Sequence, residues 1–174
     1  MRVYLLDTNV LSYFLHAGQK KALALIATRM PLALVDEVHQ EMLKDTKRGA
    51  EYRKWQPSTG IVVRTLSVGS VGATCLGKLR KKSGDSKNLG EYASIALAVD
   101  DPGLVFVTND QKGAWLAQRE LVAEGERVLG FWAFLHRAQA ATNMSRTVAE
   151  TVARVALVDH EPTWWADWLA TLPP

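Results

Sequence analysis

Near its start the chain reads Val3-Tyr4-Leu5-Leu6-Asp7-Thr8-Asn9, an apolar run that stops at an acidic residue. A second run of this kind, Leu104-Val105-Phe106-Val107, is followed by Thr108-Asn109-Asp110. Short apolar runs rich in branched and aromatic residues are typical of strands that are buried on both faces, as in a parallel sheet. In alternating α/β folds, ligands bind outside the carboxyl ends of such strands. We therefore expect Asp7 and Asp110 to emerge at the same edge of one sheet.

The rest of the chain alternates between helix and strand patterns. Asp36 is placed to cap the helix that carries Val38, Glu41 and Met42, and Lys20 to Arg29 form a helix with one apolar side. Further helices are predicted over residues 10–15, 71–80, 91–99 and 111–121, and further strands at 32–35, 61–63 and 127–129. The fold class predicted is α/β, with three α/β/α layers around a central, mainly parallel sheet.

Composition is typical of one compact domain. The 174 residues are 48% hydrophobic, which is enough for one substantial core. The single cysteine, Cys75, excludes an internal disulfide framework and is expected to be a buried small hydrophobe. The four histidines have no metal-ligand spacing, and His39 is expected at a solvated helix position. The first apolar run is too short for a signal peptide or a membrane span, so we expect a cytoplasmic, soluble protein.

Basic residues gather close to the acidic motifs, although the net charge is only +3. One run, from Lys78 to Lys82 with Lys87 after it, directly precedes Gly90-Glu91, and a second, from Lys44 to Lys54, follows Glu41. Such runs are often solvated helix faces. Beside carboxylates, they would also hold a polyanion that the acids alone repel.

The region from Phe131 onward is predicted to be helical. Val148, Val152, Val155 and Asp159 share a face at helical spacing. Near the C-terminus, Trp165, Leu169 and Leu172 fall on one stripe beside two further tryptophans. This stripe either packs on the core of the same chain or forms a surface for a partner or a second copy.

Each acidic residue also has a structural alternative. Asp7 could be a turn residue, Asp110 or Asn109 could cap the next helix, and Glu91 could form a capping box with Asn88. Taken together, the acids follow or begin predicted elements in order along the chain, which favours a carboxylate-lined metal site. The set is Asp7, Glu41, Glu91 and Asp110.

These motifs resemble those of the PIN-domain nucleases, and most closely the toxin ribonucleases of VapBC-type toxin-antitoxin pairs. The resemblance covers about residues 1–130 and rests on Leu5 to Ser12, Val38 to Glu41, Leu89 to Ala96 and Val107 to Asp110. It implies a PIN-like nuclease domain over residues 1–130, with residues 131–174 as a helical C-terminal extension packed on or extending that domain.

By this resemblance, the four acids are catalytic and hold the metal, and Asn9 and Thr108 are supporting polar groups of the catalytic site. Glu37 and Glu41 lie one helical turn apart on one face, so the residues alone allow either to reach the metal. The family usually places its second acid a turn into the helix, after a polar residue at the strand end. Asp36 occupies that polar position, which favours Glu41.

The implied activity is a metal-dependent endoribonuclease that hydrolyses RNA phosphodiester bonds, as a toxin with a cognate antitoxin and as a homodimer. Ligands that are all oxygen select Mg²⁺ or Mn²⁺ over zinc. The alternatives are a PIN nuclease of RNA processing, a catalytically silent RNA-binding or regulatory module, and a dehalogenase-like phosphatase. The phosphatase motif requires a second aspartate two positions after the first, where this chain has Asn9.

Overall fold

The computed structural model describes residues 2–83, 88–121, 126–156 and 164–173. Its centre is a five-stranded, all-parallel sheet with the order β3-β2-β1-β4-β5. The strands are β1 (Val3–Leu6), β2 (Leu32–Val35), β3 (Val62–Arg64), β4 (Leu104–Thr108) and β5 (Val128–Gly130). The predicted strands are thus confirmed with small shifts of their ends.

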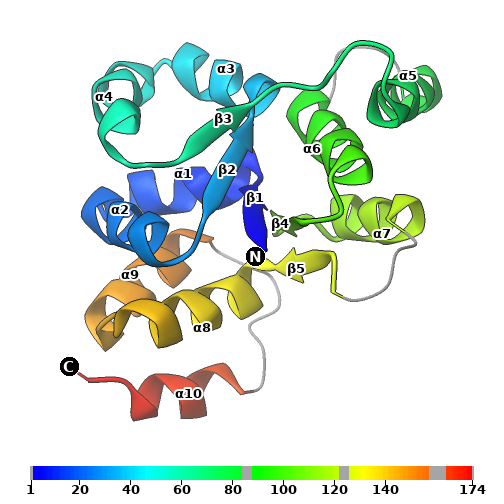
Figure 1. The fold of residues 1–174 in the computed structure, drawn as a ribbon. Helices are drawn as coiled ribbons and strands as arrows, with labels where there is room; N and C mark the ends of the chain where they lie inside the picture. The colour runs from blue at the N-terminus through cyan, green and yellow to red at the C-terminus, as the bar shows by residue number, and fades with distance from the viewer. Residues whose placement is uncertain (1, 84–87, 122–125, 157–163, 174) are drawn as a thin grey trace.

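Helices connect the strands and cover both faces of the sheet. In the described ranges they are α1 (Thr8–His16), α2 (Lys20–Arg29), α3 (Asp36–Lys44), α4 (Gly49–Trp55), the short 3₁₀ turn η1 (Gln56–Ser58), α5 (Val71–Ser83), α6 (Leu89–Asp100), α7 (Gln111–Glu120), α8 (Phe131–Thr142), α9 (Arg146–Ala156) and α10 (Trp165–Thr171). Figure 1 shows α1, α2, α8 and α9 on one face, and α6 and α7 on the other with α5 outside α6. The predicted three-layer α/β/α class is confirmed.

The sheet core is apolar on both faces, as the continuous apolar strands predict. Every residue of β2 and β4 is buried, and β1 ends in buried Leu5 and Leu6. On α2, Leu23 and Ile26 are buried as expected, and Cys75 is buried at 8% exposure. Within the described ranges, none of the helices has the length and apolar character needed to cross a membrane.

Arg127 ties β5 to the rest of the sheet. Its buried guanidinium donates hydrogen bonds to the backbone carbonyl oxygens of Leu104, Ala98 and Asp101. The sequence predicts Arg127 as the first residue of the strand, whereas the strand begins at Val128. The residue thus fastens the loops at the amino end of the sheet.

The C-terminal tail packs on its own chain. Trp165, Leu169 and Leu172 are all buried, so the predicted stripe covers the core of the same chain. Trp165 packs edge-on against Trp132 of α8, with the ring centroids 4.3 Å apart.

The helix predicted from Val148, Val152 and Val155 is confirmed as α9. Of the three valines only Val152 is buried, and Val148 and Val155 are half-buried. The buried side of α9 also carries Ala149, Ala153 and Ala156. Small alanines there let the helix approach its neighbours closely. Asp159, which completed the predicted face, lies outside the described residues.

Two local predictions are wrong. Val35, the last residue of β2, is the N-cap of α3, and Asp36 lies in the first helical turn, because the strand runs into the helix without a loop. His39 is half-buried, and its Nδ1 lies 2.7 Å from the hydroxyl oxygen of buried Tyr52. Helix α4, which carries Tyr52, supplies that partner and had no clear periodic pattern in the sequence.

Candidate active site

A polar cavity of about 230 Å³ lies at the carboxyl ends of the central strands. Strands β1 and β4 are neighbours there, and the connections from them run outward in opposite directions, to β2 and to β5. A reversal of this kind opens a crevice where α/β proteins bind ligands. The cavity is lined by Asp7, Thr8, Asn9, Glu41, Asn88, Glu91 and Asp110. All four predicted acids and Asn9 therefore meet in one place.

Asp7 is the buried member of the set, at 5% exposure. It follows β1 directly, and its backbone N–H donates to the carbonyl oxygen of Val107, which fixes it beside β4. Its Oδ2 accepts a hydrogen bond of 3.0 Å from the hydroxyl of Thr108. Thr108 is itself buried and lies beneath the cavity rather than on its wall. Thr108 therefore contacts the Asp7 carboxylate directly without lining the cavity.

Thr108 also connects Asp7 to Asp110. The backbone N–H of Asp110 donates to the Thr108 hydroxyl oxygen at 3.1 Å. Asp110 is the N-cap of α7, and its Oδ1 accepts from the N–H of Gly113 at 2.7 Å. The capping alternative for Asp110 is therefore confirmed, and the capping residue still lines the cavity.

Glu41 reaches the cavity from α3 and is held at both carboxylate oxygens. The hydroxyl of Thr8 donates to Oε2 at 2.5 Å, and the backbone N–H of Gly90 donates to Oε1 at 3.1 Å. A Cβ at position 90 would lie 2.9 Å from Oε1, so the glycine permits this close approach. Glu41, rather than Glu37, lines the cavity.

Glu91 lies in the first turn of α6, and its carboxylate packs against Gly113 of α7. A Cβ at position 113 would lie 2.3 Å from Oε2 of Glu91, well inside van der Waals contact. Asn88, the N-cap of α6, has a left-handed backbone with φ +61° and makes no side-chain cap hydrogen bond. The capping-box alternative for Glu91 is therefore wrong.

The electrostatics of the cavity favour protonation or a cation. Burial raises the pKa of Asp7 to about 6, and the nearby charges of Glu41 and Asp110 add to the rise. The pKa of Glu91 is raised to about 7, first by burial and then by the charges of Asp7 and Asp110. Carboxylates that share a desolvated site resist joint ionisation. A divalent cation would remove this penalty.

The donors fit a hard cation by their chemistry. Every acidic group of the cavity offers oxygen, and oxygen donors suit Mg²⁺ or Mn²⁺. As the side chains stand, no three His, Cys, Asp or Glu groups in the described ranges are arranged so that they could hold an ion. Mg²⁺ commonly keeps several waters and takes only one or two protein carboxylates directly.

Three residues that form or support the cavity were not predicted as site residues from the sequence: Thr8, Asn88 and Gly113. The Thr8 hydroxyl fixes Glu41, Asn88 lines the cavity, and Gly113 makes room for Glu91. The position of Thr8 within the first motif and a glycine three residues after Asp110 were the available signals. Neither shows which distant side chain lies opposite.

The chain was compared with protein-family models, with curated proteins and with solved structures, and none of the three comparisons gave a match.

Proposed function

We propose that this protein is a metal-dependent endoribonuclease of the PIN-domain type. The observation that carries the proposal is the cavity at the ends of β1 and β4, where three carboxylates, those of Glu41, Glu91 and Asp110, lie around buried Asp7. Burial, together with the charges of the neighbouring carboxylates, raises the pKa of Asp7 and Glu91 and thus lowers stability in the absence of a cation. A purely structural site has no need of that cost.

The side chains divide into two roles. Asp7, Glu41, Glu91 and Asp110 would hold Mg²⁺ or Mn²⁺, and the cation would offset their charge and polarise a phosphodiester for attack by water. Thr108 and Thr8 orient Asp7 and Glu41 through their hydroxyl groups. Asn9 is exposed on the wall of the cavity, within the space that a substrate phosphate would enter.

The toxin role, a cognate antitoxin, a homodimer and a cytoplasmic location belong to the same proposal and are supported by the motif resemblance. The basic runs agree with a polyanionic substrate only in part. Arg48 pairs with Glu51 at 3.1 Å, and Lys87 lies outside the described residues. Lys82, by contrast, is exposed on α5 and faces a groove beside α7.

The test is cleavage of a mixed pool of structured RNAs in Mg²⁺, in Mn²⁺ and in chelator. We expect the wild type to cut only with metal, and Asp7→Asn to bind RNA without cutting it. Asp7→Asn keeps the shape of the side chain, so circular dichroism should show an unchanged fold. Equal RNA binding with and without Mn²⁺ and no cutting under any condition would instead support a silent binding module.

A further inference from the structure

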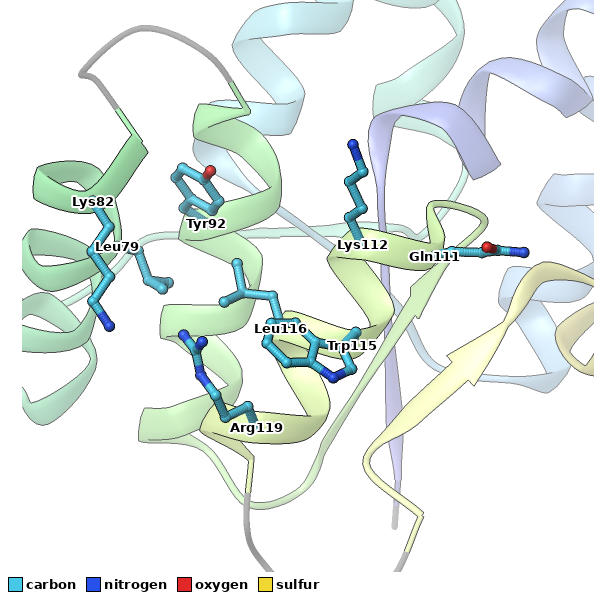
Figure 2. A pocket seen from close by; sticks show the side chains of 8 residues that line it. All are labelled: Leu79, Lys82, Tyr92, Gln111, Lys112, Trp115, Leu116 and Arg119. Atoms are coloured by element: carbon cyan, nitrogen blue, oxygen red, sulfur yellow. The ribbon is translucent and has the colours of Figure 1, made fainter.

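A second groove, of about 560 Å³, lies between α5, α6 and α7 next to the acidic cavity. Its floor is apolar, with Leu79, Tyr92 and Leu116, and its rim is polar. Figure 2 shows Leu79, Tyr92 and Leu116 between the three helices, while Lys112 and Gln111 of α7 point away from them. The groove is lined by Leu79, Lys82, Tyr92, Gln111, Lys112, Trp115, Leu116 and Arg119. The groove shares α6 and α7 with the cavity, since Tyr92 follows Glu91 and Gln111 follows Asp110.

The outstanding feature of this groove is Trp115, which is 63% exposed. The hydrated apolar face of the ring is available to a flat partner, and burial of that face would release water. The guanidinium of Arg119 lies 5.2 Å from the centroid of the Trp115 ring. Arg119 also donates from Nε and Nη2 to Oε1 of Glu120, at 3.1 Å and 2.7 Å. Arg119 therefore contacts both the Trp115 ring and the Glu120 carboxylate.

Positive charge on the rim comes from Lys82 of α5 and Lys112 of α7, both of which are exposed. Lysine is depleted in interfaces between proteins, whereas lysine around an exposed aromatic ring is the usual composition of a surface that binds single-stranded nucleic acid. The chemistry of the groove therefore favours a polyanion with flat bases over a partner protein.

The distance along α7 from Asp110 to Trp115 is comparable with the length of about two stacked nucleotides. Trp115 is five residues beyond Asp110, which corresponds to an axial rise of about 7.5 Å at 1.5 Å per residue. Stacked nucleotides advance about 3.4 Å each along one strand. Five residues also turn the helix by about 140° beyond one full turn, so a strand with one phosphate at the acidic cavity would cross α7 obliquely to bring a base about two nucleotides away to Trp115.

We propose that this groove binds single-stranded RNA beside the cleaved phosphodiester, with one base stacked on Trp115 and the neighbouring phosphates on Lys82 and Lys112. This proposal rests on the proposed function for its substrate. It adds that the substrate is unpaired where it meets α7, because a base can stack on a side chain only when it is free of its partner strand.

The experiment measures binding without cleavage. Anisotropy of a fluorescein-labelled 12-nucleotide RNA is recorded in chelator with wild type, Trp115→Ala, Trp115→Phe and, as the matched control, Trp164→Ala. Trp164 is the other exposed tryptophan, at 40%, and lies in α10's N-cap position away from the groove. We expect Trp115→Ala to weaken binding at least about fivefold, and Trp115→Phe to retain most of the affinity.

Three further comparisons complete the test. Duplex RNA should bind with little response to Trp115→Ala, and the matching DNA strand shows whether the 2′-hydroxyl contributes. Lys112→Ala should reduce the slope of log K against the logarithm of the salt concentration by about 0.7. This is the change expected when one phosphate contact on a single strand is lost. Equal affinity of wild type and Trp115→Ala would overturn the proposal, as would a change from dimer to monomer in Trp115→Ala, which would make the groove a contact between copies.

The experiments distinguish a wrong proposal for the groove from a wrong proposal for the nuclease activity. RNA cleavage that needs metal and Asp7, combined with unchanged binding by Trp115→Ala, overturns the groove alone. Weakened binding by Trp115→Ala in a protein that never cuts RNA supports the groove and refutes the nuclease.

Discussion

Asp7→Asn should stabilise the metal-free protein while it abolishes activity. The pKa of Asp7 is raised from 3.8 to about 6 in the folded chain, chiefly by burial. Ionised Asp7 is therefore less favourable in the folded than in the unfolded state. Each pKa unit corresponds to about 1.4 kcal/mol, so the penalty above pH 6 is about 3 kcal/mol. It declines as the pH falls from about 6 towards 3.8, where the carboxyl is protonated in both states.

The variant has the same shape and no charge, and its amide oxygen can still accept from the Thr108 hydroxyl. We expect a gain of up to about 3 kcal/mol at pH 8 and roughly half of that at pH 5. For a chain of this size the gain at pH 8 corresponds to a rise in Tm on the order of 5–10 °C. Added Mn²⁺ should raise the Tm of the wild type at pH 8 and leave that of Asp7→Asn nearly unchanged.

Urea and thermal unfolding at the two pH values, with and without Mn²⁺, measure these effects. Asp45→Asn is a control of opposite sign, because hydrogen bonds from the backbone N–H groups of Arg48 and Lys47 lower the pKa of Asp45. That substitution should destabilise the fold at pH 8. A loss of stability in Asp7→Asn at pH 8, or an equal gain at pH 5 and pH 8, would refute the reasoning.

Three other substitutions test the arrangement. Gly113→Ala should abolish metal-dependent cleavage with no acid removed, because the new Cβ would lie 2.3 Å from Oε2 of Glu91 and displace that carboxylate; isothermal titration with Mn²⁺ reports the lost binding. Thr108→Val should cost about 1–3 kcal/mol in urea unfolding, because it leaves a buried carboxylate and a backbone N–H without their partner. Trp165→Ala should lower stability by about 3–5 kcal/mol, because the residue is 3% exposed, and thermal unfolding measures the loss.

Matched controls accompany two of these substitutions. Gly77→Ala replaces a helical glycine of α5 that has nothing within 4 Å of the added carbon, so it should leave metal binding unchanged. Trp164→Ala removes a largely exposed ring beside Trp165 and should cost far less. Equal losses of metal binding in the two glycine variants would contradict the role given to close packing at Gly113. Equal losses of stability in the two tryptophan variants would contradict the role given to burial of Trp165.

The sequence predicts the main features of the fold because they depend on local patterns. An apolar run that ends in an acid marks both strand and strand end, so Asp7 and Asp110 were expected at one edge of the sheet. The parallel pairing of β1 with β4 places them there. The helices were found wherever apolar residues recur at helical spacing, as on α2.

Other features depend on contacts between distant segments and are not encoded locally. The choice of Glu41 over Glu37 follows from the rotation of α3 and from two donors, Thr8 and Gly90, that lie far away in sequence. The exposure of Trp115 likewise depends on how α5 and α6 pack beside α7. A periodic pattern cannot show that a helix leaves one aromatic ring in water.

The proposed function requires that the carboxylates of the cavity act together as one metal-dependent cleavage centre. Its most direct test compares Glu41→Gln with Glu37→Gln in an RNA cleavage assay in Mn²⁺. Both substitutions remove one charge from α3, and only Glu41 lines the cavity. We predict that Glu41→Gln loses cleavage by at least about a hundredfold, as expected for a group that acts on the reacting centre, and that Glu37→Gln cuts like the wild type. Full activity in Glu41→Gln would contradict the account.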